Sequence, residues 1–164
     1  MIRLHPMTDR DFGWLLGEDS RSDGLRLCVG GIAPDPVTAM LRGVAASIAE
    51  TTDEPVAWMI VEDDEVVGMT SFTRQRADGG YDIGYGVAPA HEGRGIMTRA
   101  LAELVRIAPL HGHHGLTAET SVDNPASQRV LEKNGFAATG TRHDPEDGAL
   151  ITWAITFPDH KSAA

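Results

Sequence analysis

The chain has 164 residues, of which 41% are hydrophobic and 23% charged, and its formal net charge is −10. This length and composition fit one globular domain of ordinary size with a sizeable core. The acidic charge argues against a nucleic-acid partner, because phosphate contacts need clustered Lys and Arg, and its average field either favours cationic partners or serves only to keep the protein soluble.

No stretch of the sequence reaches the length of a membrane span, and residues 1–6 lack the apolar run of a signal peptide. We therefore expect a cytoplasmic location and no membrane partner. Cys28 is the one cysteine, so no internal disulfide forms. We expect a small buried thiol there rather than a nucleophile, because no catalytic context surrounds it.

The first third of the chain predicts two helices. Asp9–Leu16 reads as a short helix opened by Thr8. Gly30-Gly31 marks a turn, and Asp35–Thr51 follows as an amphipathic helix with apolar residues at Val37, Met40, Leu41, Val44, Ala45 and Ile48.

The middle of the chain predicts antiparallel strands. Pro55–Glu62 and Val66–Arg74 are apolar runs separated by Asp63-Asp64-Glu65, which is typical of a hairpin. Gly79-Gly80 is a second turn, and Tyr81–Val87 is a third strand. Each run is short and bounded by turn residues, as expected for strands rather than helices.

The last third alternates strands and helices. A helix begins at Gly93, with an apolar stripe at Ile96, Met97, Ala100, Leu101, Leu104, Val105 and Ala108, and Pro109 and Gly112 stop it. Leu116–Ser121 is a strand. Asn124–Asn134 is a helix with Asn124 as cap, Pro125 at its first position and Gly135 at its end, and the strands Phe136–Arg142 and Ala149–Phe157 follow.

This order predicts an α+β or mixed α/β fold with helices on both faces of one sheet. We expect a single domain over residues 1–158 and a frayed tail over residues 159–164.

The segment Val87–Ile96 joins a strand to a helix through closely spaced glycines. Backbone N–H groups at such a helix start, together with the helix dipole, favour a phosphate or pyrophosphate, and Gly93 and Gly95 allow a close approach. No Lys-Ser or Lys-Thr follows Gly95, so the segment is not a P-loop. The run from Gly84 begins like a dinucleotide fingerprint but ends in Pro89. On its own a glycine turn of this kind is a weak signal.

Three segments together are more specific. Asp82–Val87, Gly93–Thr98 and Asn124–Phe136, in this order and spacing, resemble the pattern of the GNAT acyltransferase superfamily, in particular the branch that includes ribosomal-protein N-terminal acetyltransferases. The resemblance extends over nearly the whole chain. It implies a mixed, mostly antiparallel sheet that splays between two parallel strands, here Tyr81–Val87 and Leu116–Ser121.

The resemblance also implies acetyl-CoA as co-substrate and no metal. In the family the pantetheine arm lies in the notch between the splayed strands, and the turn amides bind the pyrophosphate. Carried onto this sequence, the residues that contact the cofactor are Val87, Ala88, Glu92, Gly93, Arg94, Gly95, Ile96, Met97, Asn124 and Ser127. Ala90 stands where the pattern often has Gln or Arg, which is a departure at the phosphate site.

Acetyl transfer needs a neutral amine and a protonated leaving thiol. Asp82 stands where histone-acetyltransferase members carry a glutamate base, and its shorter side chain would act through water. The Val87 N–H is the expected oxyanion donor. Leu131 replaces a tyrosine that many members use as an acid, which leaves Ser127 or water to protonate the thiolate.

Each of these residues also has a purely structural interpretation. Asp82 can be an exposed strand residue beside a charged neighbour, Asn124 can only cap its helix, and Ser127 can only satisfy first-turn amides. By alternation Tyr85 faces opposite to Asp82 and is expected in the core. The run from His111 to His114 lies in a loop without a paired carboxylate or cysteine cluster, so we expect a solvated loop there rather than a metal site.

The expected function is an acetyl-CoA-dependent N-acetyltransferase that acts by direct attack in a ternary complex. Its acceptor is a primary amine, either a protein N-terminus or a small molecule, because an α-amine loses its proton about 3 kcal/mol more easily than a lysine side chain. The alternative is a non-catalytic acyl-CoA-binding sensor or regulatory module. The sequence is compatible with either a monomer or a homodimer.

Overall fold

The computed structural model describes residues 1–158, so the expected frayed tail lies outside the described residues. The strands are β1 (Ile2–Pro6), β2 (Arg26–Leu27), β3 (Ala57–Glu62), β4 (Glu65–Gln75), β5 (Tyr81–Val87), β6 (Gly115–Ser121), β7 (Ala137–Asp144) and β8 (Gly148–Thr156). The helices are α1 (Asp9–Leu15), α2 (Asp35–Ala49), α3 (Ile96–Ile107) and α4 (Pro125–Lys133), with short 3-10 turns η1 (Pro89–His91) and η2 (Pro109–His111).

The strands form one mixed sheet. Its order is β1-β3-β4-β5-β6-β8-β7, and β2 pairs with β4 off this path. Neighbours along the path are antiparallel except β5 and β6, which are parallel. Only two residue pairs, Tyr81↔Leu116 and Asp82↔Thr117, join β5 to β6. The predicted fold, a mostly antiparallel sheet that splays between two parallel strands, is therefore confirmed.

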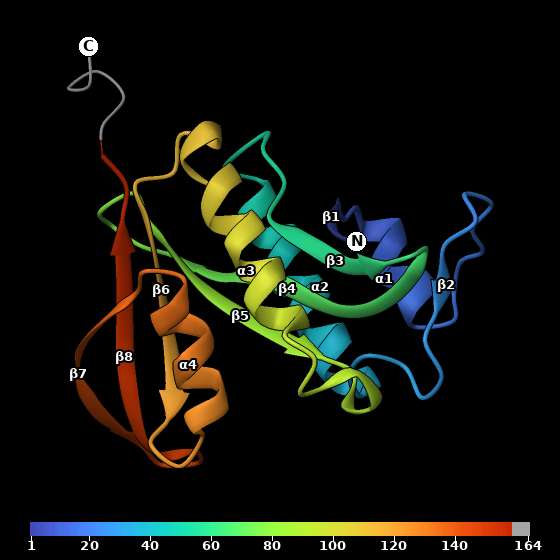
Figure 1. Cartoon of the computed structure of the whole chain (residues 1–164). Helices are drawn as coiled ribbons and strands as arrows, with labels where there is room; N and C mark the ends of the chain where they lie inside the picture. The colour runs from blue at the N-terminus through green and yellow to red at the C-terminus, as the bar shows by residue number, and fades with distance from the viewer. Residues whose placement is uncertain (159–164) are drawn as a thin grey trace.

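Helices cover both faces of the sheet. Figure 1 shows α3 and α4 in front of it and α2 behind it. On the α3 side, Leu101 and Leu104 are fully buried in the core. On the other side α2 packs over β4, and α1 packs against α2. The core includes the stacked rings of Phe72 and Tyr81, whose centroids lie 4.3 Å apart.

The predicted helices and most strands are confirmed, with small shifts at their ends. Helix α1 begins after Thr8, whose N–H donates to Asp11 Oδ2 at 2.7 Å. Helix α3 starts at Ile96 rather than at Gly93, because Gly93 and Gly95 both have positive φ, at 78° and 72°. The sequence pattern did not predict β1 or the two-residue β2. Strand β1 is an edge strand of five residues that ends in a proline, too short for a clear alternation signal.

A bulge in β4 decides the direction of one arginine. The register between β4 and β5 shifts between Phe72 and Arg74, which pair with Ile83 and Asp82. Phe72 therefore stays in the core, and Arg74 turns to the side of the sheet on which Asp82 lies.

None of the helices within residues 1–158 is both long and apolar enough to cross a membrane. In the same part of the chain no three His, Cys, Asp or Glu side chains come together in a way that could hold a metal ion.

His113 is buried in the core, unlike the solvated loop residue that the sequence predicts. Its ring packs edge-on against Phe72 and Tyr81, with centroids 5.1 and 5.0 Å away, and its Nε2 has no hydrogen-bond partner among residues 1–158. Burial, assisted by the neighbouring His111, lowers the pKa of His113. The folded state therefore favours the neutral ring.

This burial predicts acid-sensitive stability. A group whose pKa is lowered on folding contributes full stability above its unfolded pKa, about 6.5, and loses it as the pH falls toward the folded value. We expect the melting temperature of the wild type to fall more between pH 7.5 and pH 5 than that of His113→Phe, which keeps the aromatic packing. The same exchange at exposed His143 is the control, and identical pH profiles for His113→Phe and wild type would contradict the prediction.

Candidate active site

The separation of β5 from β6 opens a notch in the middle of the sheet. Beyond the Asp82↔Thr117 pair, the remaining residues of β5 and β6 form no ladder with each other. The edge of β5 from Ile83 to Val87 thus lacks a β-strand partner on the β6 side, and Figure 1 shows the two strands diverging there. An unpaired strand edge is a ready partner for an extended ligand.

The turn that follows β5 lies at the open end of the notch. Gly95 is the N-cap residue of α3 in the left-handed conformation, and no side chain caps the helix. The first N–H groups of an α-helix have no intrahelical partner, and they are partially positive. Ala88 and Ile96 are buried, and the Ala88 N–H already donates to the Val67 carbonyl at 2.8 Å, whereas Glu92 is exposed.

Two arginines lie at this turn, Arg94 within it and Arg99 in the first part of α3. Arg94 Nη2 lies 3.5 Å and Arg99 Nη2 3.8 Å from the carboxylate of Glu62 on β3, and both arginines are about half exposed. Arg94 also lies 3.0 Å from His91 Nδ1, and Arg99 donates to the carbonyl groups of Arg94 and Gly95. The sequence prediction included Arg94 and missed Arg99. The signal for Arg99 was its position four residues after Gly95, which places it beside the same helix end.

Helix α4 brings a serine to the notch from the same side. Asn124 Oδ1 accepts from the Ser127 N–H at 3.2 Å, so Asn124 caps the helix as predicted. Ser127 Oγ is free of that bond and lies 2.8 Å from Tyr85 Oη. Asn134 donates to the Thr98 carbonyl at 3.2 Å and so ties α4 to α3.

Tyr85 corrects one expectation of the sequence analysis. Its ring is half-buried and packs against the core, and it faces opposite to Asp82, as alternation predicts. Its hydroxyl, however, reaches Ser127 across 42 positions of sequence. Burial raises the pKa of Tyr85, against the lowering effect of the Ser127 hydrogen bond, so the phenol stays protonated at neutral pH. Leu131 is fully buried and has no access to this site.

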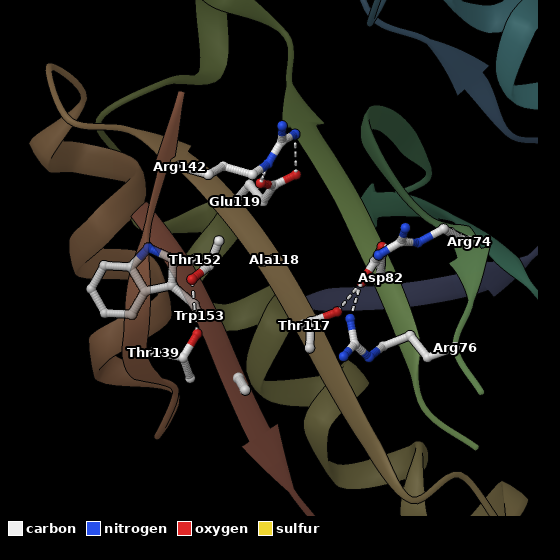
Figure 2. Close-up of a pocket in the computed structure, with 11 residues that line it drawn as sticks. Arg74, Arg76, Asp82, Thr117, Ala118, Glu119, Thr139, Arg142, Thr152 and Trp153 are labelled. Carbon is white, nitrogen blue, oxygen red and sulfur yellow. Dashed lines mark hydrogen bonds and ion pairs between the residues drawn. The ribbon is translucent and has the colours of Figure 1, made fainter. Parts of the chain in front are cut away.

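On the face of β5 opposite Tyr85 lies a groove of about 780 Å³, which we call the arginine groove. Its charged lining residues are Arg74, Arg76, Asp82, Glu119 and Arg142, and threonines on β6, β7 and β8 lie between them. Figure 2 shows two clusters, with Asp82 between Arg74 and Arg76 on one side and the Arg142–Glu119 pair on the other.

Asp82 is heavily hydrogen-bonded in this groove. Arg74 Nε donates to Asp82 Oδ2 at 2.7 Å, Arg76 Nη1 donates to Oδ1 at 3.4 Å, and Thr117 Oγ1 donates to Oδ1 as well. Asp82 is also the last residue of β5 that pairs with β6, so this cluster lies where the notch begins. Beyond it on the same face of β5 are Gly84 and Gly86, and a Cβ on Gly86 would meet nothing within 4 Å.

The structure thus brings most of the predicted residues to one opening in the sheet, but from two sides. On the side of α3 and α4 lies the turn over residues 93–96, which we call the phosphate-type turn. Arg94, Arg99 and the Ser127–Tyr85 pair lie on the same side. Asp82 and its arginines lie on the opposite face. Polar groups therefore lie on both faces of the sheet beside the unpaired edge of β5.

Comparison with known proteins agrees with this geometry. The family described as the acetyltransferase (GNAT) domain matches residues 2–137. A ribosomal-protein-serine acetyltransferase of Escherichia coli (strain K12) is 34% identical over 85 residues, which are 51% of this chain and 48% of that protein. The match thus spans about half the length of this curated relative.

Among solved structures, an acetyltransferase of Salmonella typhimurium that modifies the N-terminal serine of ribosomal protein L7/L12 has a TM-score of 0.69 and 18% identity, with 96% of this chain and 95% of that chain covered. A ribosomal L7/L12 alpha-N-protein acetyltransferase in complex with coenzyme A has a TM-score of 0.67 and 17% identity, with 95% and 94% covered. At these identities the likeness establishes the fold.

Proposed function

The chain belongs to the GNAT acetyltransferase family and is an acyltransferase, and from this premise we propose that it transfers an acetyl group from acetyl-CoA to a primary amine. The acceptor is an N-terminal α-amine or a small-molecule amine, and it attacks directly in a ternary complex. The observation that carries the proposal is the notch between β5 and β6, which is open to a phosphate-type turn on one face and to the arginine groove on the other.

The residues around the α3 turn fit the pyrophosphate of coenzyme A. Helix N-termini bind such groups through free N–H donors, and Gly93 and Gly95, both with positive φ, place no side chain of their own over the turn. Arg94 and Arg99, which both lie near Glu62, add guanidinium donors beside this turn. The pantetheine arm would lie along the unpaired edge of β5 toward Val87, whose N–H would stabilise the oxygen that gains charge during attack.

The Ser127–Tyr85 pair is suited to protonate the leaving thiolate. When the amine nitrogen bonds to the acetyl carbon, the carbon–sulfur bond breaks and the sulfur needs a proton. Ser127 Oγ would donate it and recover a proton from the Tyr85 hydroxyl, 2.8 Å away. The proton that the attacking nitrogen loses on becoming an amide would pass to solvent, and solvent would reprotonate Tyr85. Because burial keeps Tyr85 protonated, the pair is ready in the resting enzyme.

The role of Asp82 as a base stays a prediction. Both of its carboxylate oxygens already accept hydrogen bonds, from Arg74, Arg76 and Thr117. A proton from the ammonium group would reach Asp82 through water, or it would leave to solvent before attack. An α-amine makes the second route easy, because its pKa is about 8.

The cofactor site predicts a charge-specific effect at Gly95. Asp and Asn tolerate left-handed backbone better than other residues and are nearly equal in size, and a Cβ there meets nothing within 4 Å. We expect Gly95→Asp to weaken acetyl-CoA binding by ten-fold or more relative to Gly95→Asn, because only the carboxylate repels the pyrophosphate. Calorimetry would measure this.

Gly112→Asp is the control for that comparison. Gly112 also has positive φ and open space but lies beyond the other end of α3. Equal affinities for Gly95→Asp and Gly95→Asn, in folded proteins, would place the pyrophosphate elsewhere.

The proton-donor pair predicts losses in chemistry rather than in binding. Ser127→Ala and Tyr85→Phe should each lower kcat by roughly 10² with little change in acetyl-CoA affinity, and the double variant should be no worse than the poorer single one. Ser127→Ala keeps the backbone N–H that Asn124 caps, so the helix start is retained. Tyr81→Phe removes a hydroxyl from the same strand face and is the matched control. Wild-type kcat in both variants would assign the pair a structural role.

The acceptor class predicts the site of acetylation on a peptide. On one peptide with a free N-terminus and an internal lysine, the α-amine should react faster, since its deprotonation at neutral pH demands about 3 kcal/mol less. Mass spectrometry of the product locates the acetyl group, and an N-terminally blocked peptide is the control. Modification confined to the lysine ε-amine would refute the assignment. Binding of acetyl-CoA without turnover on any amine would indicate a sensor instead.

A further inference from the structure

The arginine groove holds free hydrogen-bond donors but no free carboxylate. Both oxygens of Asp82 are taken by Arg74, Arg76 and Thr117, and both oxygens of Glu119 accept from Arg142. The hydroxyl groups of Thr139 and Thr152 are 2.8 Å apart and bond to each other. A ligand in this groove therefore finds no unpartnered anion among the charged lining residues.

The free donors belong to two neighbouring guanidinium groups. Arg74 uses only Nε, so its two terminal amino groups make no hydrogen bond within residues 1–158, and its side chain is 69% exposed. Arg76 bonds through Nε to Asp78, at the outer side of the groove, and through Nη1 to Asp82, which leaves Nη2 without a bond in the same range. Because both side chains contact Asp82, these donors are held close together.

The charge of the groove lining also bears on which ligand it can bind. Arg74, Arg76 and Arg142 oppose Asp82 and Glu119, which leaves one positive charge in excess in a protein whose net charge is −10. Arg142 is fully engaged by Glu119 and lies near Asp144, and Arg76 pairs with Asp78 outside the lining, so the guanidinium most available to a ligand is that of Arg74. A guanidinium with two free terminal amino groups is the preferred bidentate partner of a carboxylate.

We infer that Arg74 and Arg76 bind a carboxylate of the acceptor, so that this enzyme selects amines that carry an acidic group close to the reacting nitrogen. The inference rests on the proposed function, because it takes the arginine groove as the acceptor side of the notch. Asp82, the shared partner of the two arginines, is the residue at which β5 and β6 part, so a carboxylate bound there lies close to an amine in the notch. The volume of the groove, about 780 Å³, suits the first residues of a peptide, with Asp or Glu among them.

The experiment uses the full chain and two C-terminally amidated peptides without lysine. They share their first residue and differ only in Glu against Gln at positions two to four. The wild type should show a kcat/KM about five- to ten-fold higher for the Glu peptide, mostly through a lower KM. Arg74→Gln should bring this ratio close to one, because kcat/KM for the Glu peptide should fall further than kcat/KM for the Gln peptide. Arg106→Gln is the matched control, since Arg106 lies on α3 and, within residues 1–158, its side chain bonds only to Glu103.

Two further arms separate the possible outcomes. The first arm uses free glutamate and its α-amide to distinguish a small acidic amine from a peptide. If one of them is acetylated faster than either peptide, and if this rate falls in Arg74→Gln, the acceptor is a small molecule that carries the carboxylate. Calorimetric titration of both peptides in the presence of coenzyme A measures recognition without chemistry.

A Glu-to-Gln ratio near one in the wild type, or a ratio that Arg74→Gln does not change, overturns the inference even if both peptides are acetylated. If no amine is acetylated at all, the proposed function fails. The calorimetric preference for the Glu peptide, and its loss in Arg74→Gln, then still decide whether the groove binds carboxylates.

Discussion

The short parallel contact between β5 and β6 is the constraint on which the rest of the site depends. Two residue pairs hold the strands together, and beyond Asp82 and Thr117 the sheet opens. Two of the paired residues, Tyr81 and Leu116, are buried in the core, where the Tyr81 ring stacks on Phe72. A sheet that stayed paired to its end would have no free strand edge. The divergence creates that edge along β5.

The two faces of this opening carry different chemistry, and each is held by contacts distant in sequence. On one face, Glu62 of β3 lies beside Arg94 and Arg99, and Asn134 joins α4 to α3, so the phosphate-type turn and Ser127 keep a fixed relation. On the other face, the bulge in β4 turns Arg74 toward Asp82.

The charge of the whole chain is a poor guide to the field at the site. An excess of acidic side chains suggests an attraction for cations. Several arginines nevertheless lie at the turn before α3 and in the arginine groove, and the carboxylates of the groove are paired with arginines. Local pairing, rather than the sum of charges, determines which groups remain available to a ligand, because interactions between exposed charges are screened within about 10 Å.

The sequence by itself determined the helices, most of the strands, the glycine turn and the cap at Asn124, because these depend on residues a few positions apart: apolar periodicity, positive φ at glycine and side-chain acceptors beside helix starts. It also placed Tyr85 and Asp82 on opposite faces of one strand, since side chains alternate along a strand. Only the tertiary structure decided that Tyr85 meets Ser127, that Arg74 and Arg76 share Asp82, that Arg99 joins Arg94 at Glu62, and that His113 is buried. Those contacts depend on three features: the point at which β5 leaves β6, the bulge in β4, and the packing of His113 against aromatic rings. No local pattern of residues encodes the geometry of these features, because each joins segments that are distant in sequence.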